Sequence, residues 1–410
     1  FLQLIMVTMK IWSVIVVNLY LITLQVPSVI GLVEGIRTYD GSDNNKNPTK
    51  KMWGAAETAY TREVPVVYND DRGEPVPGMP NARLISNIIF SKPPFSYNVL
   101  KISSIAGAFG QFVAHDIGMT GESNEEMNIV APSGDPTFDP DSEGNGSIPF
   151  KRSSYVMIDD VREQINFQSS YLDLSAVYGT EFERLAQLRS FSDGLLFEDP
   201  DVGVIKNAIG LDMAGPNINL QRAAGDKRAN VNPGLLSMHG LFLLEHNRLA
   251  KKFSSDNPKW DDEQIFQEAR KWNIAFFQSI TVNEYLPVIA GEGLEPYQGY
   301  SPYINAGTDN FFSTAAYRYG HSVINAVYQR FAPKTLSPDP FGHVLLRDSY
   351  FKPDYMEYGG ITPVIMGLIF QPEQESDLKM VDDLRNFVEG IKSDLAARDI
   401  QRGRDHGLPT

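Results

Sequence analysis

The chain contains no cysteine among its 410 residues. A fold built from it therefore has no disulfide bonds and must be stabilised by an apolar core, for which a chain of this length is large enough. Hydrophobic residues make up 42% of the sequence and charged residues 21%, as is usual for a globular protein. The absence of thiols also excludes zinc–thiolate sites, iron–sulfur clusters, thiol catalysis and haem attached through thioether bonds.

The charge of the chain excludes another class of function. Lys and Arg number 36 against 51 Asp and Glu, which gives a formal net charge of −15. No basic stripe offsets this excess. Nucleic-acid binding depends on Lys and Arg replacing phosphate counterions, so we expect no nucleic-acid partner.

The first 31 residues are almost wholly apolar, and Lys10 is their only charge. Ile11–Leu24 has the length and composition of the apolar core of a secretory signal. We therefore expect residues 1–31 to be a signal peptide, and the mature protein to be secreted, extracellular and without a membrane attachment. A signal-anchor helix is the alternative, because Ile11–Gly31 is about as long as a membrane span requires, although Pro27 disfavours it.

Apolar residues recur at helical spacing through most of the chain after Asn98. The pattern predicts helices over Ile102–Ile117, Leu235–Phe253, Asp262–Tyr285, Phe311–Phe331 and Val381–Ala397. Thr38–Pro93 is rich in Gly, Asn, Asp and Pro and is predicted to be dominated by loops. Strand signals are few and short, and there is no internal repeat or low-complexity linker. We predict a mainly α, single large domain with few short strands.

A turn-rich insertion is predicted at Ala131–Ser154. It contains Asn145-Gly-Ser147, the one N-glycosylation sequon of the chain, so a secreted form is expected to be a glycoprotein.

Two segments carry polar side chains in patterns that suit a site. Gln111 and His115 are four residues apart on the first strong helix, so they project from one face and together could orient a small ligand and move a proton. A histidine among apolar residues is, however, more often a buried core side chain. In residues 169–175, SSYLDLS, alternate positions offer hydroxyl, carbonyl and carboxylate oxygens, the ligands that calcium prefers. Without other support, an ordinary edge strand or turn is the more common explanation of that alternation.

Three further segments contain candidate residues: Gly225–Asn230 with Arg228, the helical run with Arg318 and His321, and Asp399–His406. A carboxylate that accepts a hydrogen bond from an imidazole is a common partner of a metal-bound histidine. Spacing alone pairs none of these side chains with another.

Taken together, however, these segments resemble one family. GQFVAHD, LDLSAVYG, GDKRANVNPGLLSMHGLFLLEHNRLA, YRYGHSVI and DIQRGRDHGLP occur in the order found in the animal-type haem peroxidases, the myeloperoxidase and peroxinectin superfamily. The resemblance covers residues 37–410. It implies a mostly α fold around a haem, a structural calcium ion (Ca²⁺), and oxidation driven by hydrogen peroxide. Relatives continue through further helices beyond the position of Thr410, so we expect the sequence to be truncated there.

The resemblance also implies a role for each matching residue. His115 matches the distal histidine, Gln111 its neighbour in the distal pocket, and Arg228 the distal arginine. On the proximal side, His321 matches the iron ligand and Asp399 its hydrogen-bond partner, usually Asn in the family; Arg318 and Arg402 match residues near the haem propionates. The matching calcium ligands are Asp116, Ser169, Tyr171 through its backbone carbonyl, Asp173 and Ser175.

The sequence departs from mammalian members where these bind haem covalently. Their two ester-forming carboxylates correspond to Ala114 and Val231, and the methionine that forms a further bond in myeloperoxidase corresponds to Asn232. None of these side chains can form the link, so we expect non-covalent haem b.

The resemblance implies a secreted peroxidase that reduces hydrogen peroxide and oxidises phenol-like donors or easily oxidised halides, with protein partners left open. One alternative is a catalytically silent, peroxidase-like binding or adhesion module, although His115, Arg228 and His321 are all present. Another is a fatty-acid dioxygenase of the same superfamily. Such an enzyme needs a radical-forming tyrosine three residues before the proximal histidine, where this chain has Arg318.

Overall fold

The computed structural model describes residues 36–91, 93, 95–291 and 293–409. The predicted signal peptide, residues 1–31, lies outside the described residues. Within the described ranges, no helix is both long and apolar enough to cross a membrane.

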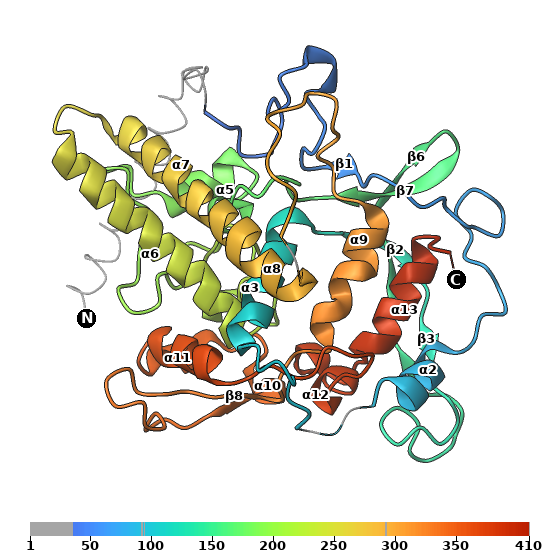
Figure 1. Ribbon diagram of the computed structural model, residues 1–410. Coiled ribbons are helices and arrows are strands. Elements are labelled where there is room, and N and C mark those ends of the chain that lie inside the picture. The colour runs from blue at the N-terminus through green and yellow to red at the C-terminus, as the bar shows by residue number, and fades with distance from the viewer. Residues whose placement is uncertain (1–35, 92, 94, 292, 410) are drawn as a thin grey trace, which may run out of the picture. The chain divides into compact units, whose positions relative to one another are not determined.

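Helices dominate Thr38–Thr410, which groups as one unit, and the predicted mainly α fold class is confirmed (Figure 1). The α-helices are α2 (Ala82–Ile89), α3 (Ser104–Ile117), α4 (Ser175–Tyr178), α5 (Phe182–Leu188), α6 (Pro233–Asp256), α7 (Asp262–Ile280), α8 (Leu286–Ala290), α9 (Asn310–Thr314), α10 (Leu346–Ser349), α11 (Thr362–Phe370), α12 (Asp382–Arg385) and α13 (Leu395–Asp405). Short 3₁₀ helices are η1 (Pro48–Lys50), η2 (Ile218–Leu220), η4 (Ala316–His321), η5 (Pro353–Glu357) and η6 (Val388–Gly390), and η3 (Thr281–Tyr285) is a π-helical turn.

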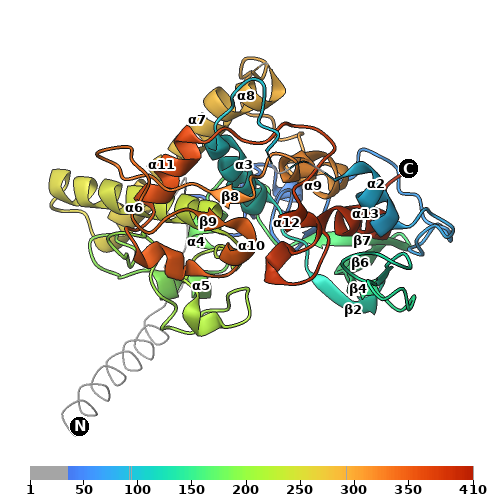
Figure 2. The same cartoon turned by 90° about the horizontal axis from the view of Figure 1, so that it is seen from below.

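The strands are short and form small antiparallel sheets (Figure 2). One sheet has the order β1 (Thr58–Ala59), β7 (Val161–Asn166), β6 (Tyr155–Ile158); the pairs are β2 (Glu122–Glu126) with β5 (Lys151–Ser153), β3 (Ile129–Val130) with β4 (Ser147–Ile148), and β8 (Val327–Tyr328) with β9 (Val344–Leu345). In the β6–β7 hairpin, Ile158 pairs with Val161 across Asp159 and Asp160, whose φ angles are 50° and 63°. Two consecutive positive φ angles match the twist of a tight hairpin.

The core is centred on α3, α6 and α7, and the last two lie side by side (Figure 1). Phe112 of α3 is fully buried and stacks on Phe242 of α6, with ring centroids 5.2 Å apart. Phe277 of α7 meets both rings edge-on at 5.6 and 5.4 Å. Aromatic pairs in these geometries add to the free energy gained from burial, so the cluster fixes α3 against the two longer helices.

The ends of these helices follow from local sequence. Asn232 caps α6 by accepting from the N–H of Leu235, and Pro233 occupies the first helical position. Asp261 and Gln264 form a reciprocal capping box at the start of α7. Capping satisfies N–H groups that have no partner within the helix, which explains why the predicted helices at Leu235–Phe253 and Asp262–Tyr285 are close to those observed.

The helix predicted over Phe311–Phe331 is wrong as a continuous element. α9 ends at Thr314, and Ala315 breaks the α geometry with φ −130° and ψ −64°. The chain then forms the tighter η4 turn and continues into strand β8. The apolar run looks helical because it packs on the core, but it does so as three short pieces.

The helix predicted over Val381–Ala397 is also wrong. α12 is only one turn long, and Glu389 and Gly390 have positive φ angles of 62° and 74°, which end helical geometry. α13 begins afresh, with Asp394 accepting from the N–H of Ala397. In the N-terminal segment predicted to be loops, the structure has one regular helix, α2, capped by Asn81.

A buried arginine joins α2 to α13. The five N–H groups of Arg83 all donate, to both carboxylate oxygens of Asp135, to Asp394, to the carbonyl of Arg385 and to Asn386. Its side chain is 2% exposed. Because every donor is satisfied, the ion pairs hold the two helices together without leaving an uncompensated buried charge.

Candidate active site

A cavity of about 430 Å³ lies between α3, η4 and α13, with further walls from Arg228–Asn232 and Tyr285. Small-molecule and cofactor sites commonly have about 300–1,000 Å³. Its polar lining includes Gln111, His115, Arg228, Asn232, Arg318, His321, Arg398 and Arg402. Every predicted catalytic and haem-binding residue except Asp399 therefore lines this one cavity, although these residues are far apart in the sequence. Asp399 is not part of the lining, but it contacts Arg318 and His321.

His115 lies in the last turn of α3. Burial, followed by the positive charge of Arg228, lowers the pKa of His115 well below its ordinary value, so the imidazole is neutral near pH 7. Among the described residues, its Nδ1 atom is buried without a hydrogen-bond partner. A neutral imidazole that faces a cavity can accept a proton there.

Arg228 is fixed beside this histidine. Its Nη2 donates to the backbone carbonyl of His115 at 3.0 Å, and its Nη1 donates to the carbonyl of Gly118 at 3.0 Å. Asp226 holds the opposite edge through Nε and Nη2. Burial raises the pKa of Asp226, but the charge and hydrogen bonds of Arg228 outweigh this effect, so the pKa lies below its ordinary value and the carboxylate stays ionised.

Gln111 lies one turn before His115 on α3. Its Oε1 accepts from Nδ2 of Asn232 at 2.9 Å, and Asn232 also caps α6. This bond ties the cavity face of α3 to the start of α6. It also fixes which end of the Gln111 amide faces Asn232.

His321 and Arg318 share one carboxylate on the other wall. Nδ1 of His321 lies 2.6 Å from Oδ2 of Asp399, and Nη1 of Arg318 donates to Oδ1 at 2.5 Å. Burial alone would raise the pKa of Asp399, but His321 and Arg318 outweigh it and lower the pKa. An ionised Asp399 orients the His321 ring and leaves its Nε2 free to bind a metal.

Arg402, which the resemblance places near haem propionates, lines the cavity and turns its Nη1 toward strand β5. There it donates to Ser153 Oγ at 2.8 Å and to Asp405 at 3.2 Å. Sequence reasoning missed Arg398, which lines the same cavity one helical turn before Arg402 and pairs with Glu389 at 2.9 Å. Its spacing from Arg402 is the signal that could have identified it.

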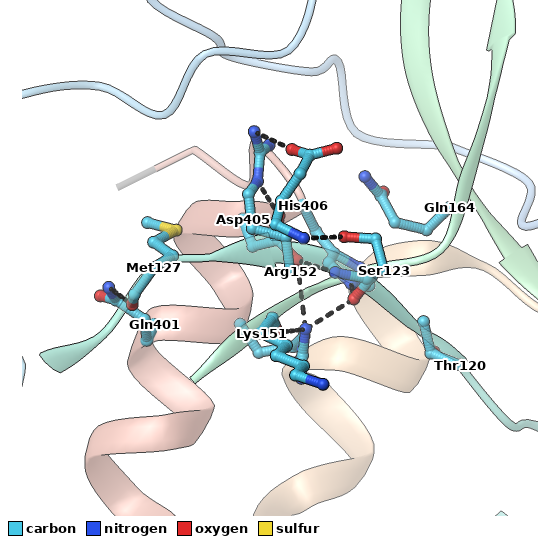
Figure 3. Close-up of polar contacts among 12 residues, drawn as sticks. Thr120, Ser123, Met127, Lys151, Arg152, Gln164, Gln401, Asp405 and His406 are labelled. Atoms are coloured by element: carbon cyan, nitrogen blue, oxygen red, sulfur yellow. Dashed lines mark hydrogen bonds and ion pairs between the residues drawn. The ribbon is translucent and has the colours of Figure 1, made fainter. Parts of the chain in front are cut away.

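The end of α13 is anchored by a buried polar network (Figure 3). Asp405 accepts from Arg152 Nε at 2.6 Å and from the backbone N–H of Ser153 at 2.7 Å. His406 is fully buried and contacts Ser153 Oγ at 2.7 Å and Thr314 Oγ1 at 2.9 Å. These contacts connect α13 to β5 and α9 and so hold the helix that carries Asp399.

The five predicted calcium ligands lie together at the C-terminal end of α3. Asp116 and Asp173 are 0% and 1% exposed, and Ser175 donates from Oγ to the backbone carbonyl of Asp116 at 2.7 Å. Ser169 Oγ donates to Asp173 at 2.6 Å, and the carbonyl of Tyr171 accepts from the N–H of Asp173 at 2.9 Å. The oxygen atoms that could coordinate a cation here belong to two carboxylates, two hydroxyls and a backbone carbonyl. Oxygen ligands of these kinds are what a hard cation prefers.

Two further observations bear on this cluster. Burial, and then the charge of Asp173, raise the pKa of Asp116 well above its ordinary value. Within the described ranges, no group of three or more histidine and acidic side chains could hold a metal ion, so a cation here would depend on hydroxyl and carbonyl oxygens as well.

Three tyrosines on the cavity wall were not predicted as site residues. Tyr317 donates to the hydroxyl of Tyr285 at 3.1 Å, and the hydroxyls of Tyr285 and Tyr319 lie 2.8 Å apart. Burial raises the pKa of all three phenols, so they are protonated near neutral pH. Tyr317 and Tyr319 flank Arg318 in the motif, but nothing in the sequence points to Tyr285.

The three positions from which we expect non-covalent haem also face the cavity. Ala114, Val231 and Asn232 are all part of its lining. None of these three side chains is a carboxylate or a methionine.

Comparison with known proteins assigns this chain to a family. The sequence model of the family described as "Animal haem peroxidase" matches residues 36–410. The chain belongs to the animal haem peroxidase family.

Individual relatives agree. The chain is 35% identical to peroxinectin A of Dictyostelium discoideum over 397 residues, 91% of this chain and 73% of that protein. It is 33% identical to peroxidasin of Drosophila melanogaster and 32% identical to thyroid peroxidase of Sus scrofa, of which it spans 28% and 48%. The solved structure of peroxidase A from Dictyostelium discoideum superposes with a TM-score of 0.86 at 33% identity, covering 92% of this chain and 77% of that one.

A fatty acid alpha-dioxygenase of Oryza sativa has the same fold, with a TM-score of 0.73 over 91% of this chain and 66% of that one. At 18% identity, this likeness concerns the fold alone.

Proposed function

We propose that this protein is a secreted haem peroxidase that reduces hydrogen peroxide and oxidises phenol-like donors or easily oxidised halides. The observation that carries the proposal is the shared cavity of His115, Arg228 and His321, with His321 hydrogen-bonded to the buried Asp399. In peroxide chemistry, His115 would transfer a proton, Arg228 would stabilise negative charge, and His321 would bind the haem iron. Bound haem would supply an iron that accepts peroxide as a ligand and exchanges electrons with it.

The lining of the cavity fits haem. Nε2 of His321 is free to bind the iron, because Nδ1 is engaged by Asp399. Arg318, Arg398 and Arg402 offer fixed positive charge for the two propionates. Ala114 and Val231 cannot form ester bonds, so the haem would be held without covalent links.

The chain's own groups then account for proton movement. Neutral His115 takes the proton of bound peroxide and returns it to the oxygen that leaves as water. The positive charge of Arg228 stabilises the negative charge that develops as the O–O bond breaks.

We further propose that calcium binds Asp116, Ser169, Tyr171, Asp173 and Ser175. The convergence of their oxygen atoms supports this assignment. Asp116 directly follows His115, so the ion would hold the end of α3 that presents the distal histidine to the cavity.

The test is a spectrum of the purified full chain loaded with haem, followed by a peroxide-dependent guaiacol assay. We expect a Soret band and turnover. His321→Ala should lose the band or weaken it severely, whereas His115→Ala should keep haem and react slowly with peroxide. An exchange of these two phenotypes would contradict the proximal and distal assignments, and a Soret band without guaiacol turnover would favour the silent module.

If haem is bound without covalent links, it can be extracted from the protein. Acid–acetone treatment of the haem-loaded protein should move all haem into the solvent. A band that stays with the polypeptide during denaturing electrophoresis would show that a covalent link exists after all.

The substrate range should include phenols and iodide but exclude efficient use of chloride. Chloride is the hardest common halide to oxidise and needs an electron-poor iron. Covalent links that withdraw electron density cannot form at Ala114, Val231 or Asn232, and the carboxylate of Asp399 makes His321 a more basic ligand than an Asn partner would. Taurine chlorination should therefore be far slower than guaiacol oxidation on the same preparation; comparable rates would contradict the prediction.

A fatty-acid dioxygenase is the less favoured candidate. The position that would need a radical-forming tyrosine is Arg318, and its guanidinium is engaged with Asp399.

A further inference from the structure

Asp226 lies behind Arg228, outside the lining of the cavity. Its side chain is 0% exposed and contacts the Nε and Nη2 edge of the guanidinium, with Nε to Oδ1 at 3.0 Å. The same Oδ1 accepts from the backbone N–H of Arg228 at 2.6 Å. Asp226 therefore fixes both the backbone and the side chain of a residue that faces the cavity.

Asp226 is itself tied to the segment that contains the proposed calcium ligands. Gln168 Nε2 donates to Asp226 Oδ2 at 2.7 Å, and Gln168 directly precedes Ser169. The backbone N–H of Asp226 donates to the carbonyl of Ala176 at 2.9 Å. Gln168 and Asp226 are 3% and 1% exposed, so water cannot readily replace either contact.

These contacts determine what Arg228 can offer to a ligand. A guanidinium has five N–H donors. Nε–H is directed to Asp226, the two N–H groups of Nη2 are directed to Asp226 and to His115, and one N–H of Nη1 is directed to Gly118. Among the described residues, one Nη1 donor is left for the cavity, and its direction is set by the other four.

We propose that Asp226, oriented by Gln168, is a positioning residue that holds the Arg228 guanidinium in place so that its remaining N–H faces the cavity. The arrangement ties the distal arginine to the Ser169–Ser175 segment, just as Asp116 ties the distal histidine to it. The inference rests on the proposed function, since it assumes that a ligand occupies the cavity beside Arg228.

Fluoride is a suitable probe, because it is a small anion that binds ferric haem and accepts a hydrogen bond from a nearby donor. Its dissociation constant is read from the absorption spectrum of the haem-loaded, ferric full chain, without turnover. In Asp226→Asn we expect the affinity to fall about tenfold or more, because a hydrogen bond to a charged group is lost or misdirected. Gln168→Leu should weaken binding in the same direction.

A double-mutant cycle separates positioning from a general effect on the fold. In an Arg228→Leu background, Asp226→Asn should change the fluoride affinity by less than about twofold, because the group through which Asp226 acts is gone. Asp199→Asn is the matched control. It removes a carboxylate that pairs at 2.8 Å with another buried arginine, Arg222, and neither residue lines the cavity. It should leave the fluoride affinity unchanged.

An unchanged or tighter fluoride affinity in Asp226→Asn would overturn the inference, as would an equal loss in both backgrounds. Loss of haem from both Asp226→Asn and Gln168→Leu would show a role in folding and would also overturn it. If the unaltered protein binds haem and fluoride but does not oxidise guaiacol, the proposed function fails while the positioning role is still measured.

Discussion

Of the two glycines of α3, Gly110 leaves less room for a side chain than Gly107. A Cβ atom at this position would lie 2.2 Å from the hydroxyl oxygen of Tyr285, a distance that requires the tyrosine to move. Tyr285 connects Tyr317 to Tyr319 through hydrogen bonds, so moving it would disturb the whole group. The glycine is therefore required by a close approach and not by its backbone conformation.

Gly110→Ala should lower the free energy of unfolding by about 1–3 kcal/mol, the usual range for an overpacked core. Thermal unfolding of the full chain measures the change. Tyr285→Phe in the same chain should restore part of the loss, because the nearest remaining ring atom would be 3.1 Å from the new Cβ.

Gly107→Ala on the same helix is the control. There the nearest atom, on the side chain of Val323, is 3.2 Å away, so a smaller effect is expected. Equal destabilisation by the two alanines would show that the Tyr285 hydroxyl does not constrain Gly110.

At the scale of residues, the sequence identified most of the candidate residues but only some of their hydrogen-bond partners. His321 and Asp399 are 78 positions apart, and Asn232 and Gln111 are 121 apart. No local pattern relates such residues, because their contact depends on how α3, η4, α6 and α13 pack. The motifs of the family supplied the first pair, whereas the second is seen only in the folded structure.

At the scale of elements, the oxygen-rich segment between β7 and α4 has the clearest testable role. Asp173→Ala should remove bound calcium and lower the melting temperature together. If calcium is present at about 100 times its dissociation constant, its binding adds about 2.7 kcal/mol to the free energy of unfolding. Metal analysis and thermal unfolding with and without a chelator measure both effects.

Asp139→Ala provides a comparison. Asp139 is also buried in a loop, where it accepts from the N–H groups of Gly134 and Gly144. Its loss should destabilise the protein without changing the calcium content. Unchanged calcium stoichiometry in Asp173→Ala would remove Asp173 from the ligand set.

Helices were predictable from the sequence where apolar residues at helical spacing are preceded by a capping residue. α3, α6 and α7 combine both signals, with Ser103, Asn232 and Asp261 at their first turns. The apolar run from Phe311 lacks a stop signal at Ala315, where tertiary packing alone turns the chain into η4. The spacing of apolar residues predicts which face of a segment is buried, but it does not predict where a helix ends.

At the scale of the whole molecule, buried histidines should make stability depend on pH. Burial lowers the pKa of His246 from its ordinary value of 6.5 to about 4. Its ring is neutral in the folded state, with contacts to Tyr178 at Nδ1 and to the carbonyl of Gly194 at Nε2. As the pH falls below 6.5, the unfolded chain binds a proton that the folded chain does not, so folding becomes less favourable.

Between pH 7 and pH 4, this one residue should lower the free energy of unfolding by about 3 kcal/mol. Urea unfolding across this range gives the slope, which His246→Gln should reduce. His343→Gln, at an exposed position, should leave the slope as it is. Identical slopes in His246→Gln and the unaltered protein would assign the acid sensitivity to other groups.

The pairing of α2 with α13 has a consequence for biosynthesis. Arg83 is made early, yet Asp394, one of its two carboxylate partners, follows 311 residues later. Asp399, which orients His321, lies on the same late helix. A ribosome makes the chain from its N-terminus, so the cavity wall that contains His321 stays incomplete in the nascent polypeptide until α13 emerges. Haem capture would therefore follow the synthesis of α13, and chaperones that shield the incomplete fold would affect the yield of folded protein.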